Sequence, residues 1–297
     1  MKSLYTSLFA IICLNVLNGQ TPEQEIILET HSVFAPAIKQ MDINADGNME
    51  FIYLRSSKIQ VCENTGDSAW QKIYIINEFS SDIITDFAFG DVNDDGFDDI
   101  IYSPYSGIKK IRVLINPTDN SSNWEEIILT EEARTVIGVF DINTDGWNDI
   151  IYEDVTTHIN YYKNNSGEFT ESVLIYNPTY TLTLFKTADI DLDGDIDIVG
   201  HFNSTGTLFF KNQGDGTVNT TIISSDFYEH QLAVDDFDGD GYLDVMIRYS
   251  ASIKIALFDL LSGEYDTPVG LGSIYANDYD VADYDNDGDA DILLTKF

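Results

Sequence analysis

A nine-residue acidic motif that recurs six times is the feature that most constrains how this chain can fold. Its copies begin at Asp42, Asp91, Asp141, Asp189, Asp236 and Asp283, so that successive copies start 47 to 50 residues apart. The fourth copy, DIDLDGDID at residues 189–197, places five aspartates in nine positions and runs directly into apolar residues. Carboxylates at this density repel one another. A near-constant period of this length predicts a repeat protein in which each copy belongs to one structural unit.

The residue types within the motif are fixed at alternate positions. Positions 1 and 5 are Asp in every copy, position 3 is Asn or Asp, position 6 is Gly, and position 9 is Asp or Glu. Oxygen-bearing side chains at alternate positions converge on the inside of a turning loop, and Gly permits the sharp turn. No copy contains His or Cys. The pattern therefore predicts all-oxygen ligation of a hard cation, Ca²⁺ before Mg²⁺ or Mn²⁺, with up to six ions.

Two other kinds of structure share part of this motif. The EF-hand loop shares the opening D-x-D-x-D-G but needs a Glu at position 12 and flanking helices. Position 12 is never acidic here, being for example Tyr53, Gly200 or Leu294. The residues after the motif, such as DIIY (99–102), have the β-branched content of strands. The EF-hand is excluded on both counts, and the alternative left is a set of Asx-rich hairpin turns that bind no metal.

Between the motifs the chain consists of short strand-like runs. In the second repeat these runs are TDFAFG (85–90), DDIIY (98–102), KKIRVLINP (109–117) and NWEEIILTE (123–131). Runs of β-branched and aromatic residues separated by Gly, Asn, Ser and Pro are typical of strands and turns. Four strands in each repeat predict an all-β fold, a β-propeller of about six four-stranded blades. A solenoid and a sandwich are the alternatives.

The two ends of the chain bear on the last blade. The sixth repeat ends after its second predicted strand, in ADILLTKF (290–297). Near the other end, EIILET (25–30) closely matches EIILTE (126–131), a predicted fourth strand. A spare fourth strand can complete the last blade and cover its exposed edge. We therefore expect a last blade that is incomplete or is closed by the N-terminal strand.

The repeat resembles the FG-GAP/VCBS repeat of integrin α-subunit propellers and of many secreted bacterial proteins. The loop D-x-[DN]-x-D-G-x-x-[DE] carries this resemblance, together with FAFGD at Phe87–Asp91, and the likeness covers nearly all of residues 33–297. The FG dipeptide occurs in the second copy alone and there is no GAP tripeptide, so the VCBS-like branch fits better. The resemblance implies that the loop joins the two innermost strands of a blade. It also implies that positions 1, 3, 5 and 9 ligate calcium by their side chains and position 7 by its carbonyl.

The predicted metal ligands therefore occupy five positions in each of six loops. They are Asp42, Asn44, Asp46, Asn48, Glu50; Asp91, Asn93, Asp95, Phe97, Asp99; Asp141, Asn143, Asp145, Trp147, Asp149; Asp189, Asp191, Asp193, Asp195, Asp197; Asp236, Asp238, Asp240, Tyr242, Asp244; and Asp283, Asp285, Asp287, Asp289, Asp291. The last three loops have Asp at position 3 where the first three have Asn. More ligand charge generally tightens binding, so we expect the last three loops to hold calcium more tightly.

Residues 1–19 have the pattern of an export signal. Lys2 is followed by a mostly apolar run from Leu4 to Leu17 and then by Gly19 near a plausible cleavage point. The run is shorter than the ~20 residues that a membrane span needs, and no later run approaches that length. We expect a signal peptide at 1–19, a propeller domain at 20–297, no transmembrane segment, and a secreted or cell-surface location. A membrane anchor that stays uncleaved is the alternative.

The charge of the chain limits its partners. It has 51 Asp and Glu residues against 15 Lys and Arg, a formal net charge of −36. Binding to nucleic acid or to anionic lipid needs the opposite balance. A hydrophobic content of 43% is too high for a disordered acidic chain. An ordered chain with this charge indicates bound cations.

The sequence contains no recognisable catalytic group. His31, His158, His201 and His230 fall at unrelated places in the repeat, and the motifs of serine hydrolases, zinc proteases and P-loop proteins are missing. Aromatic residues at position 7, such as Trp147, are candidates for display toward a ligand. We therefore expect a monomeric, non-catalytic binding or adhesion module for an extracellular glycan or protein. A calcium-dependent polysaccharide lyase, or another carbohydrate-active enzyme on a propeller scaffold, is the alternative.

Overall fold

The computed structural model describes residues 38–55, 58–64, 70–78, 84, 86–104, 109–118, 123–226, 231–249, 252–273, 278–285 and 287–295. The chain divides into two compact units, Met1–Phe87 with Gly96–Ile128 and Ala88–Asp95 with Leu129–Phe297. Every regular element in these described residues is a β-strand. Among them there is accordingly no helix long and apolar enough to cross a membrane. The predicted all-β class is confirmed.

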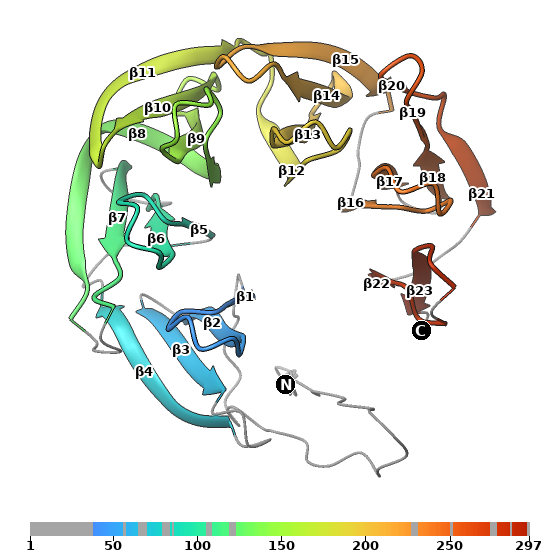
Figure 1. The fold of residues 1–297 in the computed structure, drawn as a ribbon. Helices are drawn as coiled ribbons and strands as arrows, with labels where there is room; N and C mark the ends of the chain where they lie inside the picture. Colours follow the sequence, from blue (N-terminus) through green and yellow to red (C-terminus); the bar gives the residue numbers. More distant parts are fainter. Residues whose placement is uncertain are drawn as a thin grey trace, which may run out of the picture. The chain divides into compact units, whose positions relative to one another are not determined.

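In the first unit, consecutive strands form an antiparallel sheet of order β1-β2-β3-β4 (Figure 1). The strands are β1 (Ile38–Met41), β2 (Glu50–Arg55), β3 (Lys58–Asn64) and β4 (Trp70–Glu78). The second repeat supplies β5 (Phe87–Gly90), β6 (Asp99–Tyr102) and β7 (Lys110–Ile115), and β6 pairs antiparallel with β7. Each repeat thus builds its sheet from neighbouring stretches of chain.

In the second unit, β12-β13-β14-β15 and β16-β17-β18-β21 are again four-stranded sheets, whereas β8 to β11 belong to a seven-stranded sheet of order β11-β10-β9-β8-β7-β6-β5 (Figure 1). Their strands are β8 (Glu125–Phe140), β9 (Asp149–Asp154), β10 (Ile159–Asn165), β11 (Glu168–Tyr176), β12 (Leu182–Ala188), β13 (Asp197–Phe202), β14 (Gly206–Asn212), β15 (Val218–Ser224), β16 (Gln231–Asp235), β17 (Asp244–Tyr249), β18 (Ser252–Ala256) and β21 (Val269–Ser273). Two smaller pairs are β19 (Phe258–Asp259) with β20 (Glu264–Tyr265) and β22 (Asp278–Ala282) with β23 (Asp291–Thr295).

The predicted strands are largely confirmed, with one difference at β8. The sequence predicts separate strands at 123–131 and 136–140, whereas the chain runs as one strand from Glu125 to Phe140. The residues between them, EART (132–135), include no Gly, Pro, Asn or Ser that would make a turn. β8 begins in the first unit and ends in the second, where it pairs with β9. The expected signal peptide and the closing strand at 25–30 lie outside the described residues.

The middle strands of the sheets are buried on both faces, which explains why their sequences are continuous apolar runs. β13 is buried over its whole length, whereas the outer strand β11 is mostly exposed. In the second unit the covering face comes from the next sheet, because one cluster joins Ile151 of β9 with Phe202 and Phe210. The Tyr176 ring meets the Phe210 ring edge-on, with centroids 5.0 Å apart. Consecutive sheets of this unit therefore pack face to face.

Truncation of Phe210 tests this packing. Because the ring is buried between two sheets, Phe210→Ala is expected to lower the free energy of unfolding by about 3–5 kcal/mol. Ile222→Ala, on the exposed side of the neighbouring strand β15, is the control and is expected to change it by less than about 0.5 kcal/mol. Urea unfolding followed by fluorescence measures both. Equal effects of the two substitutions would contradict the packing described.

Candidate metal-binding loops

Each acidic motif connects two consecutive strands. The six loops lie between β1 and β2, β5 and β6, β8 and β9, β12 and β13, β16 and β17, and β22 and β23. Position 9 of every motif is the first residue of the strand that follows, from Glu50 on β2 to Asp291 on β23. The strands therefore fix both ends of each loop, and the motif spans the turn between them.

Inside the loop, the carboxylate at position 1 accepts backbone hydrogen bonds. Asp42 Oδ1 accepts the N–H of Asp46 at 3.1 Å, and Asp42 Oδ2 accepts that of Gly47 at 2.8 Å. Ala45 and Gly47 have φ angles of 55° and 87°, and such left-handed residues turn successive N–H groups toward the inside of a loop. The same pairs of positions are bonded in the loops that begin at Asp141, Asp236 and Asp283.

The carboxylate at position 9 is buried in the first five loops and partly buried, as Asp291, in the sixth. Asp197 is fully buried, and its oxygens accept the N–H of Ile190 at 3.2 Å and that of Asn212 at 2.8 Å. Burial raises the pKa of Asp197 to about 7. Burial likewise raises the pKa to about 6 in Glu50, Asp149 and Asp244. Burial disfavours the charged form of a carboxylate, and a nearby cation favours it.

Three acidic side chains converge in each of the last three loops. Oxygens at positions 1, 3 and 9 lie within 4.8 Å of one another in the sets Asp189, Asp191, Asp197; Asp236, Asp238, Asp244; and Asp283, Asp285, Asp291. In the first set, Asp189 Oδ1 and Asp191 Oδ1 are buried without a hydrogen-bond partner. A buried carboxylate oxygen of this kind is costly unless something compensates it. An oxygen-only, mostly anionic donor set fits a hard cation such as Ca²⁺.

In the first three loops position 3 is an asparagine, and in the second and third loops its amide donates to a neighbouring carboxylate. Asn143 Nδ2 donates to Asp149 Oδ2 at 2.6 Å. Asn93 Nδ2 donates to Asp95 Oδ2 at 3.0 Å, and its amide oxygen accepts the N–H of Asp95 at 3.2 Å. Each such N–H stabilises one carboxylate oxygen. These loops consequently bring fewer bare carboxylates together than the last three do.

Position 5 orients the peptide group of position 7. Asp145 Oδ1 accepts the N–H of Trp147 at 3.1 Å. The same bond is made by Asp46, Asp193, Asp240 and Asp287 to the residue at position 7 of their loops. Each loop thus gathers its predicted ligands within one short turn. Their coordination of an ion stays a prediction.

Comparison with known protein families agrees with this repeat. The FG-GAP-like repeat family matches residues 42–102, 141–200, 189–247 and 236–294, more than half of the chain. The chain belongs to the FG-GAP-like repeat family. Each matched stretch begins at the first aspartate of a loop, so the family and the acidic motif define the same repeat.

Solved structures that are similar in fold to this chain are distant from it in sequence. One is a lectin of Agrocybe aegerita, described as specifically recognising non-reducing terminal N-acetylglucosamine, with a TM-score of 0.64 and 17% identity over 88% of this chain and 74% of the lectin. Another is BBS1N in complex with ARL6DN, with a TM-score of 0.57 and 9% identity over 93% of this chain and 79% of that one. No curated protein matches the chain. At these identities the likeness extends to the fold alone.

Sequence reasoning missed an asparagine at the end of the third strand of the FG-GAP-like repeat. The backbone N–H of Asn164 donates to Asp149 Oδ1 at 2.7 Å, while its amide donates to Asn148 O at 2.9 Å and to Val92 O of the preceding repeat at 2.8 Å. Asn116 bonds in the same way to Ile43 of the first repeat. Asn64, Asn116, Asn164 and Asn212 lie 14 to 17 residues after position 9. This regular spacing in the sequence could have identified the asparagines as part of the repeat.

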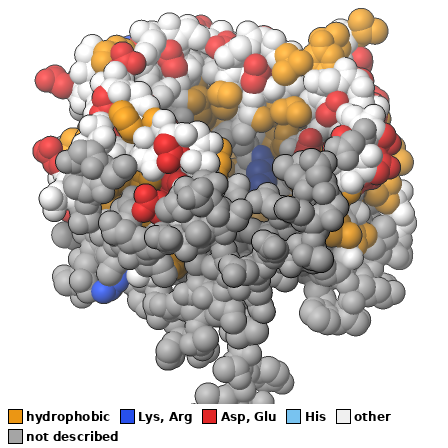
Figure 2. Space-filling model, turned by 60° about the horizontal axis from the view of Figure 1, so that its bottom comes forward, with side chains coloured by type: hydrophobic (Ala, Val, Ile, Leu, Met, Phe, Trp, Pro, Cys, Tyr) orange, Lys and Arg blue, Asp and Glu red, His pale blue; other side chains and the backbone are white. Residues whose placement is uncertain are grey.

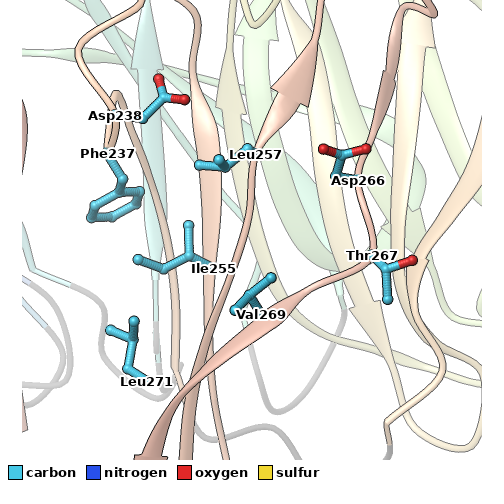
Figure 3. Close-up of a pocket in the computed structure, with 8 residues that line it drawn as sticks. All are labelled: Phe237, Asp238, Ile255, Leu257, Asp266, Thr267, Val269 and Leu271. Carbon is cyan, nitrogen blue, oxygen red and sulfur yellow. The ribbon is translucent and has the colours of Figure 1, made fainter.

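The loop of the fifth FG-GAP-like repeat also borders a pocket of ≈ 570 Å³. Its lining residues are Phe237, Asp238, Ile255, Leu257, Asp266, Thr267, Val269 and Leu271. In Figure 3 the apolar side chains form the wall, and Asp238 and Asp266 lie toward one end of the pocket. Val269 and Leu271 on β21 are both exposed. This pocket combines an apolar surface with a carboxylate that is also a predicted metal ligand.

Acidic side chains outnumber basic ones on the described part of one face. Figure 2 shows Asp and Glu side chains across the described part of one face, with few Lys and Arg among them. The two described histidines lie in separate surroundings: His201 is buried on β13 beside Thr207, and His158 Nδ1 lies 3.4 Å from Asp154 Oδ2. These histidines do not share a site. His31 and His230 lie outside the described residues.

The third-strand asparagine gives a direct test of how adjacent repeats are joined. Asn164→Ala removes two amide donors from buried carbonyl oxygens and is expected to cost about 1–3 kcal/mol of unfolding free energy. The neighbouring Asn165→Ala is the matched control, because Asn165 is exposed and bonds only locally, to Thr170 Oγ1. Thermal and urea unfolding measure both. If Asn165→Ala destabilises as much as Asn164→Ala, the link between repeats is not the cause.

Proposed function

We propose that this chain is a secreted, calcium-stabilised β-propeller that binds an extracellular glycan or protein ligand without catalysing a reaction. The observation that carries the proposal is the pair of buried oxygens Asp189 Oδ1 and Asp191 Oδ1, which have no hydrogen-bond partner and face a third carboxylate, Asp197. A divalent cation supplies the compensation that these oxygens need. The same motif recurs in six loops, so up to six ions would be bound.

The propeller is proposed from the repeat and its packing. FG-GAP-like repeats each contribute up to four antiparallel strands, and neighbouring repeats of the second unit pack face to face. Six such sheets around an axis make six blades. The sixth blade would be completed by the strand at residues 25–30 or left incomplete. Export would follow from residues 1–19, and the domain would act as a monomer.

Calcium in these loops would act on structure, with no reaction step. It would draw positions 1, 3, 5 and 9 together and hold the carbonyl of position 7 in place. The strands on either side of the loop would then be fixed at one end, and through the third-strand asparagine so would the neighbouring repeat. Loops held in this way present a rigid surface, which favours selective binding because little conformational freedom is lost.

A binding role is supported by the family and by the pocket beside the fifth loop. The Agrocybe aegerita lectin shows that a chain of similar fold recognises a sugar. In the present protein, Phe237, Val269 and Leu271 offer apolar contact, and Asp238 offers a carboxylate beside a proposed ion. Apolar walls with a few convergent polar groups are the usual form of a ligand pocket. We propose this pocket as the ligand site.

Calcium removal tests the metal part of the proposal. Calcium at ~100 times its dissociation constant adds roughly 2.7 kcal/mol per site if the unfolded chain does not bind it. Chelation with EDTA should therefore lower the melting temperature markedly, and calcium rather than magnesium should restore it. Differential scanning calorimetry of the purified chain measures this. A melting temperature indifferent to both EDTA and calcium would contradict the proposal.

Glycan-array binding tests the ligand part. Leu271→Glu places a charge on the exposed wall of the pocket. It is expected to weaken the affinity for the glycan at least tenfold, with little change in the free energy of unfolding. Leu174→Glu on the outer strand β11 is the matched control, because Leu174 is similarly exposed but lies away from the pocket lining. Loss of binding in both variants would exclude the pocket as the site. Release of unsaturated products absorbing in the ultraviolet would identify a lyase instead.

A further inference from the structure

Two lysines on third strands point their ammonium groups at loop carboxylates. Lys211 Nζ contacts Asp191 Oδ2 and lies 3.4 Å from Asp193 Oδ2. Lys163 Nζ lies 3.5 Å from Asp145 Oδ2. Both lysine side chains are about 29% exposed, so the ammonium groups are only partly hydrated. Each lysine thus brings a fixed positive charge to a predicted metal ligand.

The two lysines occupy the same place in the repeat. Lys163 and Lys211 directly precede the asparagines whose N–H groups bond to position 9 of the loop. At the corresponding place the first, second and fifth repeats have Glu63, Ile115 and Leu257. The side chain at this place therefore varies between basic, acidic and apolar, while the loop motif stays the same.

We propose that Lys163 and Lys211 are built-in cations that lower the calcium affinity of their loops, residues 141–149 and 189–197, and hold these loops together when calcium is absent. The inference rests on the proposed binding of calcium in the loops. It assigns these two residues the role of setting site affinity, and it distinguishes their two loops from the fifth loop, which has Leu257 at the same place in the repeat.

The geometry in the fourth loop shows how the two cations would compete. The Asp191 side chain is 8% exposed; its Oδ2 faces Lys211 Nζ, and its Oδ1 is buried without a hydrogen-bond partner. A divalent ion bound by Asp191 Oδ1 and Asp189 Oδ1 would lie beside the ammonium group. Like charges at such distances repel strongly when partly shielded from water. Binding the ion therefore requires the lysine to withdraw or the affinity to fall.

This changes the order of affinities that carboxylate number alone predicts. The fourth and fifth loops each carry four side-chain carboxylates at positions 1, 3, 5 and 9. The fifth loop has Leu257 where the fourth has Lys211. We expect the fifth loop to bind calcium more tightly than the fourth, and the fourth to depend less on calcium for its order.

Terbium luminescence reports on the third loop, because Trp147 at position 7 of that loop can sensitise a Tb³⁺ ion bound there. In the full-length chain, Lys163→Met is expected to lower the Tb³⁺ dissociation constant of the Trp147-dependent signal on the order of tenfold. Trp147→Phe identifies the share of the signal that comes from this loop. Lys186→Met on the exposed part of β12 makes the same change in net charge and is expected to leave the constant unchanged.

A second variant tests the fourth loop through stability. Lys211→Met is expected to lower the melting temperature in EDTA, because the Asp191 and Asp193 carboxylates lose their counter-charge, and to enlarge the rise that calcium produces. Lys211→Arg, which keeps the charge, should behave like the unsubstituted chain in both buffers. The two readouts shift in opposite directions, which a purely packing role of the lysine would not cause.

The outcomes separate this inference from the proposed function. The inference is overturned if Lys163→Met leaves the Tb³⁺ dissociation constant of the Trp147-dependent signal unchanged. It is also overturned if Lys211→Met leaves the calcium-induced rise in melting temperature unchanged. Neither result would contradict calcium binding itself. Tighter binding in Lys163→Met together with a larger calcium response in Lys211→Met supports the inference. Failure of every variant to show any metal-dependent signal overturns the inference and the proposed function together.

Discussion

Repulsion between carboxylates in the acidic loops is the constraint on which the rest of the structure depends. Each loop brings Asp or Glu side chains into one turn, and the protein opposes their repulsion with backbone N–H groups directed inward. Asp42 receives two such N–H groups, and the buried Asp197 receives two more. These bonds leave Asp189 Oδ1 and Asp191 Oδ1 without a hydrogen-bond partner. Hydrogen bonding thus compensates only part of the negative charge. Compensating the remaining charge is the proposed role of calcium.

The same loops connect one repeat to the next. The carboxylate at position 9 holds the third strand of its own repeat, and the asparagine at that strand's end reaches a carbonyl in the preceding loop. In the second unit this polar contact runs beside the apolar contact between sheets, where Phe202 and Phe210 pack with Ile151. Changes in the charge of a loop are therefore expected to be felt by its neighbour. A repeat protein stabilised through nearest neighbours in this way needs each interface to be satisfied.

The sequence predicted the all-β class, four strands per repeat and the position of each loop, because the motif and the strand runs are local patterns. The break expected between residues 131 and 136 was wrong, since the chain continues as β8 and no local residue forces a turn there. The asparagines were missed because their partners, such as Val92 for Asn164, lie in another repeat. The contact of Lys211 with Asp191 joins residues 20 positions apart and likewise has no local signature. Long-range polar contacts were therefore the part that the sequence did not reveal.

Anomalous diffraction from crystals grown in calcium, collected at long wavelength, tests the central claim most directly. We expect anomalous peaks inside the loops, with oxygen ligands from positions 1, 3, 5, 7 and 9, and an ion bound to Asp189 Oδ1 and Asp191 Oδ1. When calcium is limiting, the peak in the fifth loop is expected to be stronger than that in the fourth. Loops without anomalous density at saturating calcium, with these two oxygens bonded only to protein or water, would contradict it.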